Sequence, residues 1–192
     1  MAGKRRSAIA MRITGGAARG VALKPPSAPG VRPTTDRVRT ALFNLLAPRG
    51  IEGAVVADLF AGTGSLGIEA LSRGAAHAAF VEFDRRQAAD IRANLHAAKA
   101  QDRAAVLQAD VHRAVERLEG AYDIVLMDPP YRDPFPARLV ERIVERGLLA
   151  EDAVVVVGHP SRAEAPTRCG TLTLTQDRRY GDSSLAFYEA AR

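Results

Sequence analysis

The sequence predicts an α/β fold with a doubly wound, mostly parallel sheet that ends in an antiparallel strand. Two observations predict it. From residue 54 onward, short apolar runs alternate with segments of helical periodicity, as in strands joined by crossover helices. The last two apolar runs have no long helix between them, so they should pair antiparallel. Since 192 residues with 47% apolar content suit one core, we expect a main domain at 35–192 behind a small arm at 1–34.

The arm is expected to be a β-hairpin followed by a linker. β-prone runs at 11–14 and 21–23 are joined through glycines, and residues 25–33 are rich in Pro and Gly. Thr34-Thr35 then offers an N-cap to a helix that Pro48 stops. The apolar residues that should face the domain are Val38, Ala41, Leu42, Leu45 and Leu46. The same spacing leaves Arg37, Arg39 and Asn44 on the polar side of the helix.

The main domain then alternates strand and helix. The expected strands span residues 54–60, 78–81, 104–108, 124–127 and 154–157, and two tail strands span 172–176 and 185–188 around a loop at 178–182. The expected helices span residues 65–73, 111–118 and 138–146, with a further one capped by Asp84. In such a sheet a ligand binds outside the carboxyl ends of the strands, beside the point where strand order reverses.

Basic residues gather near the N-terminus. Residues 1–40 carry a net charge of +8, whereas the rest of the chain carries −3. This asymmetry indicates a polyanion-binding attachment on a separate body, and the alternative is a solvated basic tail. The expected nucleic-acid contacts are Arg12, Arg19, Lys24, Arg32, Arg37 and Arg39.

Composition excludes several other classes. The single cysteine, Cys169, cannot form an intramolecular disulfide or a cysteine metal cluster, so no metal site is expected. No apolar run approaches ~18 residues, and the basic residues Lys4 to Arg6 are not followed by the apolar stretch of a signal peptide. We therefore expect a cytoplasmic protein with no membrane partner.

A glycine-rich loop follows the first strand of the main domain. Residues 62–67 fit the G-x-G-x-x-G pattern, in which glycines let the backbone approach a ligand at a helix N-terminus. Asp58 lies just before this loop, where a carboxylate repels a pyrophosphate but attracts the ammonium of a methionine. This favours S-adenosylmethionine over NAD. Glu82 ends the next strand, where an acid can accept both hydroxyls of the ribose that the two cofactors share.

The third and fourth strands also end in acids. Asp110 can accept from an adenine amine with Val111 beside the ring, or it can cap the following helix, and the two roles are compatible. Because buried unpaired acids are costly, such acids at successive strand ends indicate a binding site. The expected cofactor contacts are Asp58, Phe60, Ala61, Gly62, Thr63, Gly64, Glu82, Phe83, Asp110 and Val111.

The motif after the fourth strand is Asp128-Pro129-Pro130-Tyr131, and it indicates methyl transfer to a base amine. The lone pair of such an amine is delocalised into its ring. Asp128 can accept one N–H and a carbonyl of the stiff Pro-Pro turn the other, which favours a pyramidal, nucleophilic nitrogen. Tyr131 can stack on the base. Taken alone, the motif is equally compatible with an ordinary turn after a buried strand.

Several stretches together resemble the RsmD family. They are residues 12–16, 19–20, 32–39, 42–44, 58–64, 69–74 and 128–131. The segment Arg-Pro-Thr-Thr-Asp-Arg-Val-Arg at 32–39 is far more specific than the motifs shared with other amino-methyltransferases. The resemblance implies a Rossmann-like class I S-adenosylmethionine-dependent methyltransferase that modifies the exocyclic N2 of one guanine in bacterial 16S ribosomal RNA.

The remaining expectations concern partners and one departure from the family. We expect a monomer that acts on 16S rRNA, either free or in the assembled small subunit. At the end of the fifth strand Gly158-His159 stands where we expect the family to carry an acid, and His159 is interpreted as a solvated loop residue. The alternatives are an adenine-N6 DNA methyltransferase, a nicotinamide-dependent oxidoreductase and a non-catalytic ribosome-assembly RNA binder.

Overall fold

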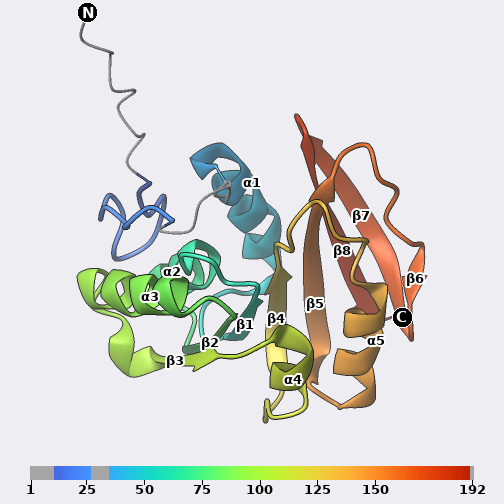
Figure 1. Ribbon diagram of the computed structural model, residues 1–192. Coiled ribbons are helices and arrows are strands. Elements are labelled where there is room, and N and C mark those ends of the chain that lie inside the picture. Colours follow the sequence, from blue (N-terminus) through green and yellow to red (C-terminus); the bar gives the residue numbers. More distant parts are fainter. Residues whose placement is uncertain (1–10, 27–34, 191–192) are drawn as a thin grey trace, which may run out of the picture.

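The computed structural model describes residues 11–26 and 35–190, and its centre is an eight-stranded sheet (Figure 1). The strand order is β3-β2-β1-β4-β5-β8-β7-β6. The strands are β1 (Val55–Leu59), β2 (His77–Glu82), β3 (Ala104–Gln108), β4 (Tyr122–Met127), β5 (Leu149–Pro160), β6 (Arg168–Cys169), β7 (Leu172–Tyr180) and β8 (Ser183–Ala190).

The predicted doubly wound topology is confirmed. Strands β1 to β5 pair in parallel, whereas β8 pairs antiparallel with β5 and with β7. The chain moves outward from β1 to β3 in one direction and from β4 to β5 in the other. The order therefore reverses between β1 and β4, which places a ligand site at their carboxyl ends.

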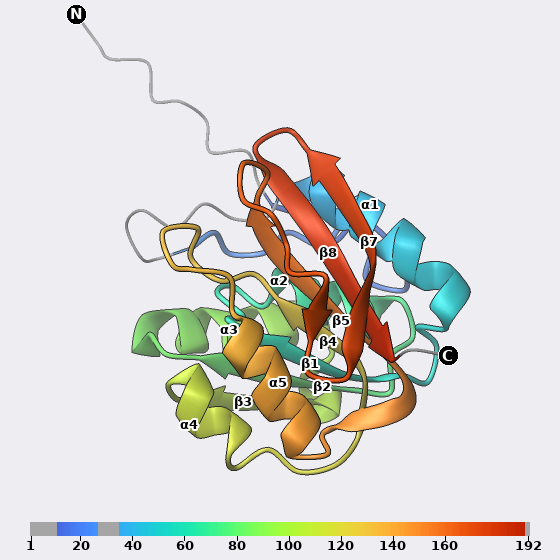
Figure 2. The same cartoon turned by 90° about the vertical axis from the view of Figure 1, so that its right-hand side faces the viewer.

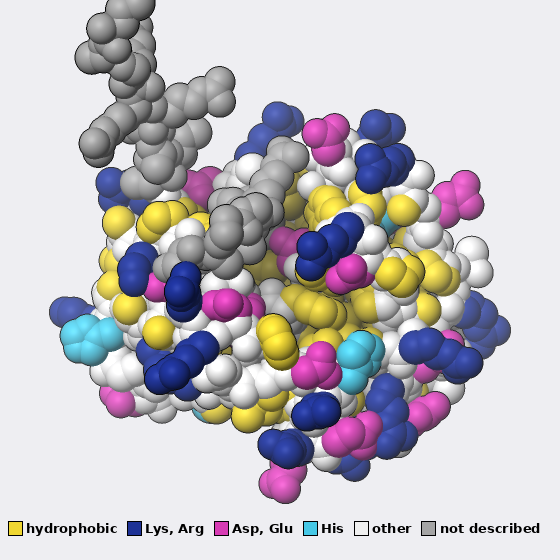
Figure 3. All heavy atoms as spheres, in the orientation of Figure 1, with side chains coloured by type: hydrophobic (Ala, Val, Ile, Leu, Met, Phe, Trp, Pro, Cys, Tyr) yellow, Lys and Arg dark blue, Asp and Glu magenta, His cyan; other side chains and the backbone are white. Residues whose placement is uncertain are grey.

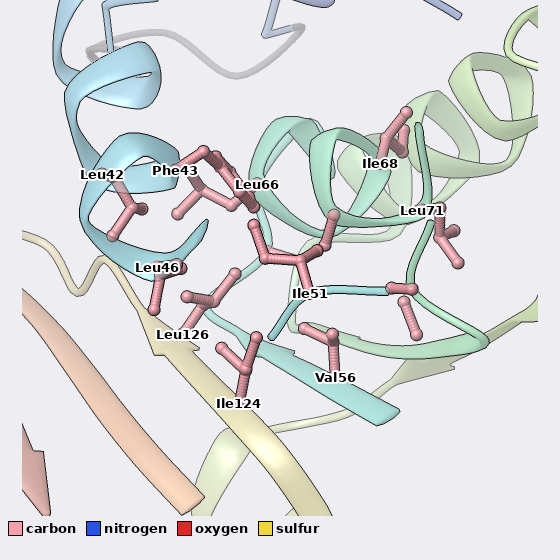
Figure 4. Packing of buried hydrophobic residues seen from close by; sticks show 14 of the residues in the cluster. Leu42, Phe43, Leu46, Ile51, Val56, Leu66, Ile68, Leu71, Ile124 and Leu126 are labelled. Carbon is pink, nitrogen blue, oxygen red and sulfur yellow. The ribbon is translucent and has the colours of Figure 1, made fainter. Parts of the chain in front are cut away.

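Helices cover both faces of the parallel part of the sheet (Figures 1 and 2). They are α1 (Asp36–Leu46), α2 (Ser65–Ser72), α3 (Arg85–Ala97), α4 (Val111–Val115) and α5 (Ala137–Glu145), with single 3₁₀ turns at Ala47–Arg49 and Gln101–Arg103. One core cluster joins α1, α2 and α3 to one face, and a second joins α4 and α5 to the other. Figure 4 shows Phe43 of α1 beside Leu66 of α2, and Leu46 beside Leu126 of β4.

The predicted hairpin is confirmed, and it packs on the domain. Arg12 and Ala22 form an antiparallel bridge, and the side chains of Met11, Ile13 and Leu23 belong to the first core cluster. Its turn lies on the end of α2, because the Ala17 amide donates to the Ser72 carbonyl over 2.7 Å. A Cβ on the nearby Gly16 would fall 1.8 Å from that carbonyl oxygen, so a side chain there would prevent this approach.

Most predicted boundaries hold within a few residues, but the tail differs. β5 is longer than predicted, β6 was missed, and the predicted loop at 178–182 is wrong because Arg178, Arg179 and Tyr180 continue β7. Tyr180 pairs with Ser183, which leaves a tight turn at Gly181-Asp182, and Gly181 has a φ of 66°. Among the described residues, no helix is long and apolar enough to cross a membrane.

Candidate functional site

Asp58 lies near the carboxyl end of β1 with its side chain 1% exposed. Its Oδ2 accepts a hydrogen bond of 2.8 Å from the Gly67 amide in the first turn of α2. Burial is the main cause that raises the pKa of this carboxyl to about 8, and the negative charges of Asp128 and Glu82 add to it. The acids at the ends of β1, β2 and β4 therefore act on one another, and a cation placed among them would be strongly favoured.

The loop between β1 and α2 has a strained backbone. Phe60 has a φ of 65°, which is unusual for a bulky residue, and Gly62 and Gly64 are also in the left-handed region. The Gly64 amide closes the turn by donating to the Ala61 carbonyl. A Cβ on Gly67 would lie 2.4 Å from the Phe80 ring, so this glycine lets α2 approach the sheet. The backbone is thus held close to the space above β1, as a nucleotide-like ligand requires.

Glu82 ends β2 beside this loop. Its Oε2 accepts from the Gly62 amide over 2.7 Å and its Oε1 from the Asp84 amide over 2.8 Å, so the carboxylate has a fixed orientation. Burial raises its pKa above the ordinary value. The next residue, Phe83, is 76% exposed, an unusual placement for a large apolar ring.

The third strand leads into the predicted cap. Asp110 is the N-cap of α4, and its Oδ1 accepts from the amides of His112 and Arg113. Val111 is buried in the second core cluster. The capping role of Asp110 is confirmed, while its contact with an adenine amine stays a prediction.

Asp128, Pro129, Pro130 and Tyr131 form the turn after β4. The Asp133 amide donates to the Pro130 carbonyl over 2.9 Å, which closes the turn. Among the backbone bonds of residues 11–26 and 35–190, none ends on the Pro129 carbonyl, so this oxygen is the second acceptor candidate of the motif. Tyr131 is 37% exposed. Its ring is accessible enough for a base to stack on.

A cavity of about 210 Å³ opens beside this turn. It lies between residues 129–136 and the segment at the end of β5, from Gly158 to Ala163. On the face seen in Figure 3, the surface is hollowed near its centre, and hydrophobic and acidic side chains lie in the hollow. The cavity beside the turn is lined by Tyr131, Phe135 and several prolines, so it suits a flat, partly apolar group such as a base.

The strand ends fit the methionine, ribose and adenine parts of S-adenosylmethionine. Asp58 is a buried carboxylate whose raised pKa shows that its negative charge is poorly compensated, so an ammonium or sulfonium would stabilise it. Glu82 is held by backbone amides at the next strand end, and the exposed ring of Phe83 adjoins it. The carboxylates of Asp58 and Glu82 suit a cationic nucleoside better than a pyrophosphate, whose negative charges they would repel.

Asn94 is a site residue that the sequence did not single out. It lies on the buried face of α3, where its Nδ2 donates to the Thr63 carbonyl over 3.0 Å and its Oδ1 accepts from the Lys24 amide over 2.7 Å. One side chain thereby joins the glycine-rich loop to the end of the hairpin. The sequence did contain an indication of this role. Asn94 lies at helical spacing beside Ile91 and Leu95, which places it on the buried face, where an amide needs hydrogen-bond partners.

The predicted nucleic-acid contacts fall into four groups, of which the buried Arg39 is described separately below. Arg12, Arg19 and Arg37 are exposed. Lys24 is 57% exposed, but its Nζ lies 2.6 Å from Asp90 Oδ1, so its charge is already compensated. Arg32 lies outside the described residues.

The prediction that Arg39 stays on the polar side of α1 was wrong. Its side chain is fully buried, and its Nε donates to Glu69 Oε2 over 3.2 Å while its Nη2 reaches Asp36 and the Arg12 carbonyl. Glu69 also accepts from the Thr14 amide and from Arg73. Compared with the prediction, the buried face of α1 is therefore rotated about the helix axis so that it includes Arg39. An acid in the otherwise apolar stretch of α2 was the overlooked signal that a buried cation had to face it.

The prediction that His159 is a solvated loop residue was also wrong. It lies in β5 with 2% exposure, and its Nε2 is 3.1 Å from Asp177 Oδ1 of β7. Its ring meets the edge of Phe135, with centroids 5.8 Å apart. His159 therefore packs the end of β5 against β7 and against the loop that carries the Asp-Pro-Pro-Tyr motif.

Comparison with known proteins agrees with this geometry. The family described as "Conserved hypothetical protein 95" matches residues 11–189. The "Ribosomal RNA small subunit methyltransferase D" of Escherichia coli K12 is 36% identical over 93% of this chain and 89% of its own. YlbH of Bacillus subtilis, provisionally named an rRNA methyltransferase, is 35% identical over 93% and 98%. The solved structure of yhhF from Escherichia coli, provisionally named a methyltransferase, has a TM-score of 0.80 at 36% identity and covers 94% of this chain and 98% of its own.

Proposed function

Because the chain belongs to the RsmD family, whose match spans residues 11–189, we propose that it is an S-adenosylmethionine-dependent methyltransferase of 16S rRNA. The reaction transfers a methyl group to the exocyclic N2 of one guanine. This proposal rests on one observation: two acids, Asp58 and Asp128, lie at the carboxyl ends of the adjoining strands β1 and β4. Asp58 is a buried carboxylate in need of a cation, and Asp128 begins a rigid turn beside a base-sized cavity.

The cofactor supplies an activated methyl group on a sulfonium when it is bound. We assign its contacts to the loop at 58–64, to Glu82 and Phe83, and to Asp110 and Val111. Asp58 stabilises the methionine ammonium, and Glu82 accepts from the ribose hydroxyls. The exposed ring of Phe83 and the buried Val111 contact the adenine. These residues bind and orient the cofactor without taking part in bond making.

Asp128 and the Pro129 carbonyl reshape the target amine. Each accepts one N–H, so the nitrogen lone pair is drawn out of conjugation and directed at the methyl carbon. With S-adenosylmethionine bound, N2 would form its new bond to the methyl carbon as the sulfur–carbon bond breaks, and the sulfur would keep the electron pair of the broken bond. The methylated amine is then acidic enough to give its proton to Asp128 or to water. Tyr131 stacks on the base, which must leave its stack in the RNA to reach the cavity.

Exposed basic residues of the hairpin and of α1 hold the RNA in this proposal. We assign phosphate contacts to Arg12, Arg19 and Arg37, which are exposed, and expect a monomer to act in the cytoplasm on free or assembled small-subunit RNA. Division of the chain into an RNA-binding arm and a methyltransferase domain is also part of the proposal. The hairpin is nevertheless tied to the glycine-rich loop through Asn94.

The test is methyl transfer from tritiated S-adenosylmethionine to three substrates in parallel: naked 16S rRNA, assembled small subunits and duplex DNA. We expect label in at least one RNA substrate and none in DNA. Label in DNA alone would favour the adenine-N6 alternative. RNA binding without transfer to any substrate would favour the assembly-factor alternative, and binding of NAD in place of S-adenosylmethionine would favour an oxidoreductase.

A further inference from the structure

Gly158 lies beside Asp128, the residue that we assign to the target amine. Strands β4 and β5 pair in parallel with Met127 opposite Val157, so Asp128 and Gly158 are neighbours across the two strand ends. A Cβ placed on Gly158 would lie 2.6 Å from Asp128 Oδ1 and 3.4 Å from its Cγ. The Asp128 carboxylate therefore occupies the space that a side chain at position 158 would need.

The backbone at this position does not itself require glycine. The described glycines with a positive φ do not include Gly158, so an alanine could adopt its conformation. Only the contact with the Asp128 carboxylate disfavours a side chain, because the Met127 carbonyl, 3.5 Å from the same Cβ position, is at an ordinary van der Waals distance. Glycine at this strand end is thus explained by the position of the carboxylate.

The end of β5 is also held firmly, so it cannot yield to a larger residue. Gly158 and His159 pair antiparallel with Leu185 and Ser184 of β8. The buried His159 is anchored by Asp177 and packs against Phe135, which belongs to the loop after Asp128. A side chain at position 158 would therefore displace the Asp128 carboxylate before it moved the strand.

We propose that Gly158 is a positioning residue, which leaves room for the Asp128 carboxylate to lie across the end of β5, beside the cavity that Gly158 itself lines. This inference rests on the proposed function, because it assigns Asp128 to the target amine. In this chain, a larger residue at position 158 would compete with the Asp128 carboxylate for the same space. Gly158 acts through Asp128 and has no contact of its own with the reacting atoms.

The experiment is a double-mutant cycle of Gly158→Ala with Asp128→Ala, using methyl transfer to small-subunit RNA. The single variant Gly158→Ala should lower kcat by about 10- to 100-fold, the loss expected when a reacting group is displaced by about 1 Å. Its affinity for S-adenosylmethionine should be unchanged. Adding Gly158→Ala to Asp128→Ala should cause no further loss, because the group through which it acts is gone.

Thermal unfolding of the same four proteins gives a second readout that needs no activity. Gly158→Ala should lower Tm in the wild-type background and leave it unchanged or raised when Asp128 is already Ala, since the crowding is relieved. Gly147→Ala is the matched control: Gly147 has a φ of 65°, no atom within 4 Å of its Cβ position, and a place before the opposite end of β5. It should cost stability and leave kcat intact.

Three results would overturn the inference: a wild-type kcat in Gly158→Ala, an equal additional loss in the Asp128→Ala background, or an equal loss of Tm in both backgrounds. Failure of the proposed function would give a different set of results. In that case the wild-type protein itself would transfer no methyl group to RNA, whereas the Tm cycle would still report whether the two residues compete for space.

Discussion

At the scale of single residues, the buried acids at the strand ends favour a cationic ligand. Asp58 and Glu82 are held by backbone amides, and burial raises the pKa of both. The sequence predicted their places because each follows an apolar run. It did not predict that Arg39 and His159 are buried, since their burial depends on Glu69 and Asp177, which are distant in sequence and meet them only in the folded chain.

Replacing Asp128 with Ala should lower turnover by at least ~100-fold, the typical cost of removing one oriented electrostatic group from a transition state. Steady-state kinetics with small-subunit RNA measure this, and calorimetry should find little change in cofactor affinity. Asp152→Ala is a suitable control, because Asp152 is exposed and lies before the buried stretch of β5. Near wild-type turnover in Asp128→Ala would remove Asp128 from the mechanism.

Asp58 predicts a proton release on cofactor binding. Its folded pKa of about 8 lies above its ordinary value of 3.8, so the carboxyl is mostly protonated at pH 7 and an arriving ammonium should ionise it. Calorimetry in buffers of different ionisation enthalpy should detect close to one proton released at pH 7. The release should disappear in Asp58→Asn and fade above pH 8.

The same pKa fixes a pH dependence of stability. Because the folded pKa is raised, this group stabilises the cofactor-free protein fully below about pH 4, and that contribution is lost as the pH rises through about 8. Asp58→Asn should therefore flatten the decline in unfolding free energy across this range. An identical decline in both proteins would show that Asp58 is ionised throughout.

At the scale of elements, the hairpin, α1 and α2 form one unit around Glu69. Helix α1 was predicted from its N-cap and apolar spacing, and Thr35 indeed accepts from the Val38 amide. The orientation of α1 could not be read from the sequence, because its charged Arg39 turns inward to an ion pair. Strand β6 was missed because two residues are too few to show a periodicity. Strand β7 is longer than predicted, because the polar residues in its second half resemble a loop in the sequence.

Arg39→Ala should lower the free energy of unfolding by roughly 3–5 kcal/mol, because it leaves the fully buried Glu69 without one of its cationic partners. Chemical denaturation measures the loss. Arg37→Ala should change stability by less than about 0.5 kcal/mol, since Arg37 is exposed on the same helix. Equal losses for the two arginines would contradict the assignment of Arg39 to the fold and Arg37 to RNA.

At the scale of the whole molecule, the basic hairpin packs on the same domain that carries the candidate site. The N-terminal residues 1–40 carry +8 while the remainder carries −3, and the described part of the hairpin packs into the core next to the glycine-rich loop. Lys and Arg side chains border the hollow seen in Figure 3. RNA held by these cations would thus lie close to the carboxyl ends of β1 and β4.

Reversing the charge of Arg12 and Arg19 should weaken RNA binding and flatten its salt dependence. Each lost phosphate contact removes roughly 0.7 to 0.9 from the slope of log affinity against log salt. Both side chains are exposed, so Tm and cofactor affinity should stay near wild type. Lys24 is unsuited to this test, because its pairing with the buried Asp90 ties it to the fold. An unchanged slope would show that these residues make no phosphate contacts.

The central claim is that the site methylates a guanine N2 of small-subunit RNA. The most direct measurement is mass spectrometry of nucleosides from 16S rRNA, digested after reaction with the wild-type protein or with Asp128→Ala. We predict N2-methylguanosine in the wild-type reaction and a large reduction of it in the variant. N6-methyladenosine as the product, or RNA that stays unmethylated with the wild-type protein, would contradict the account.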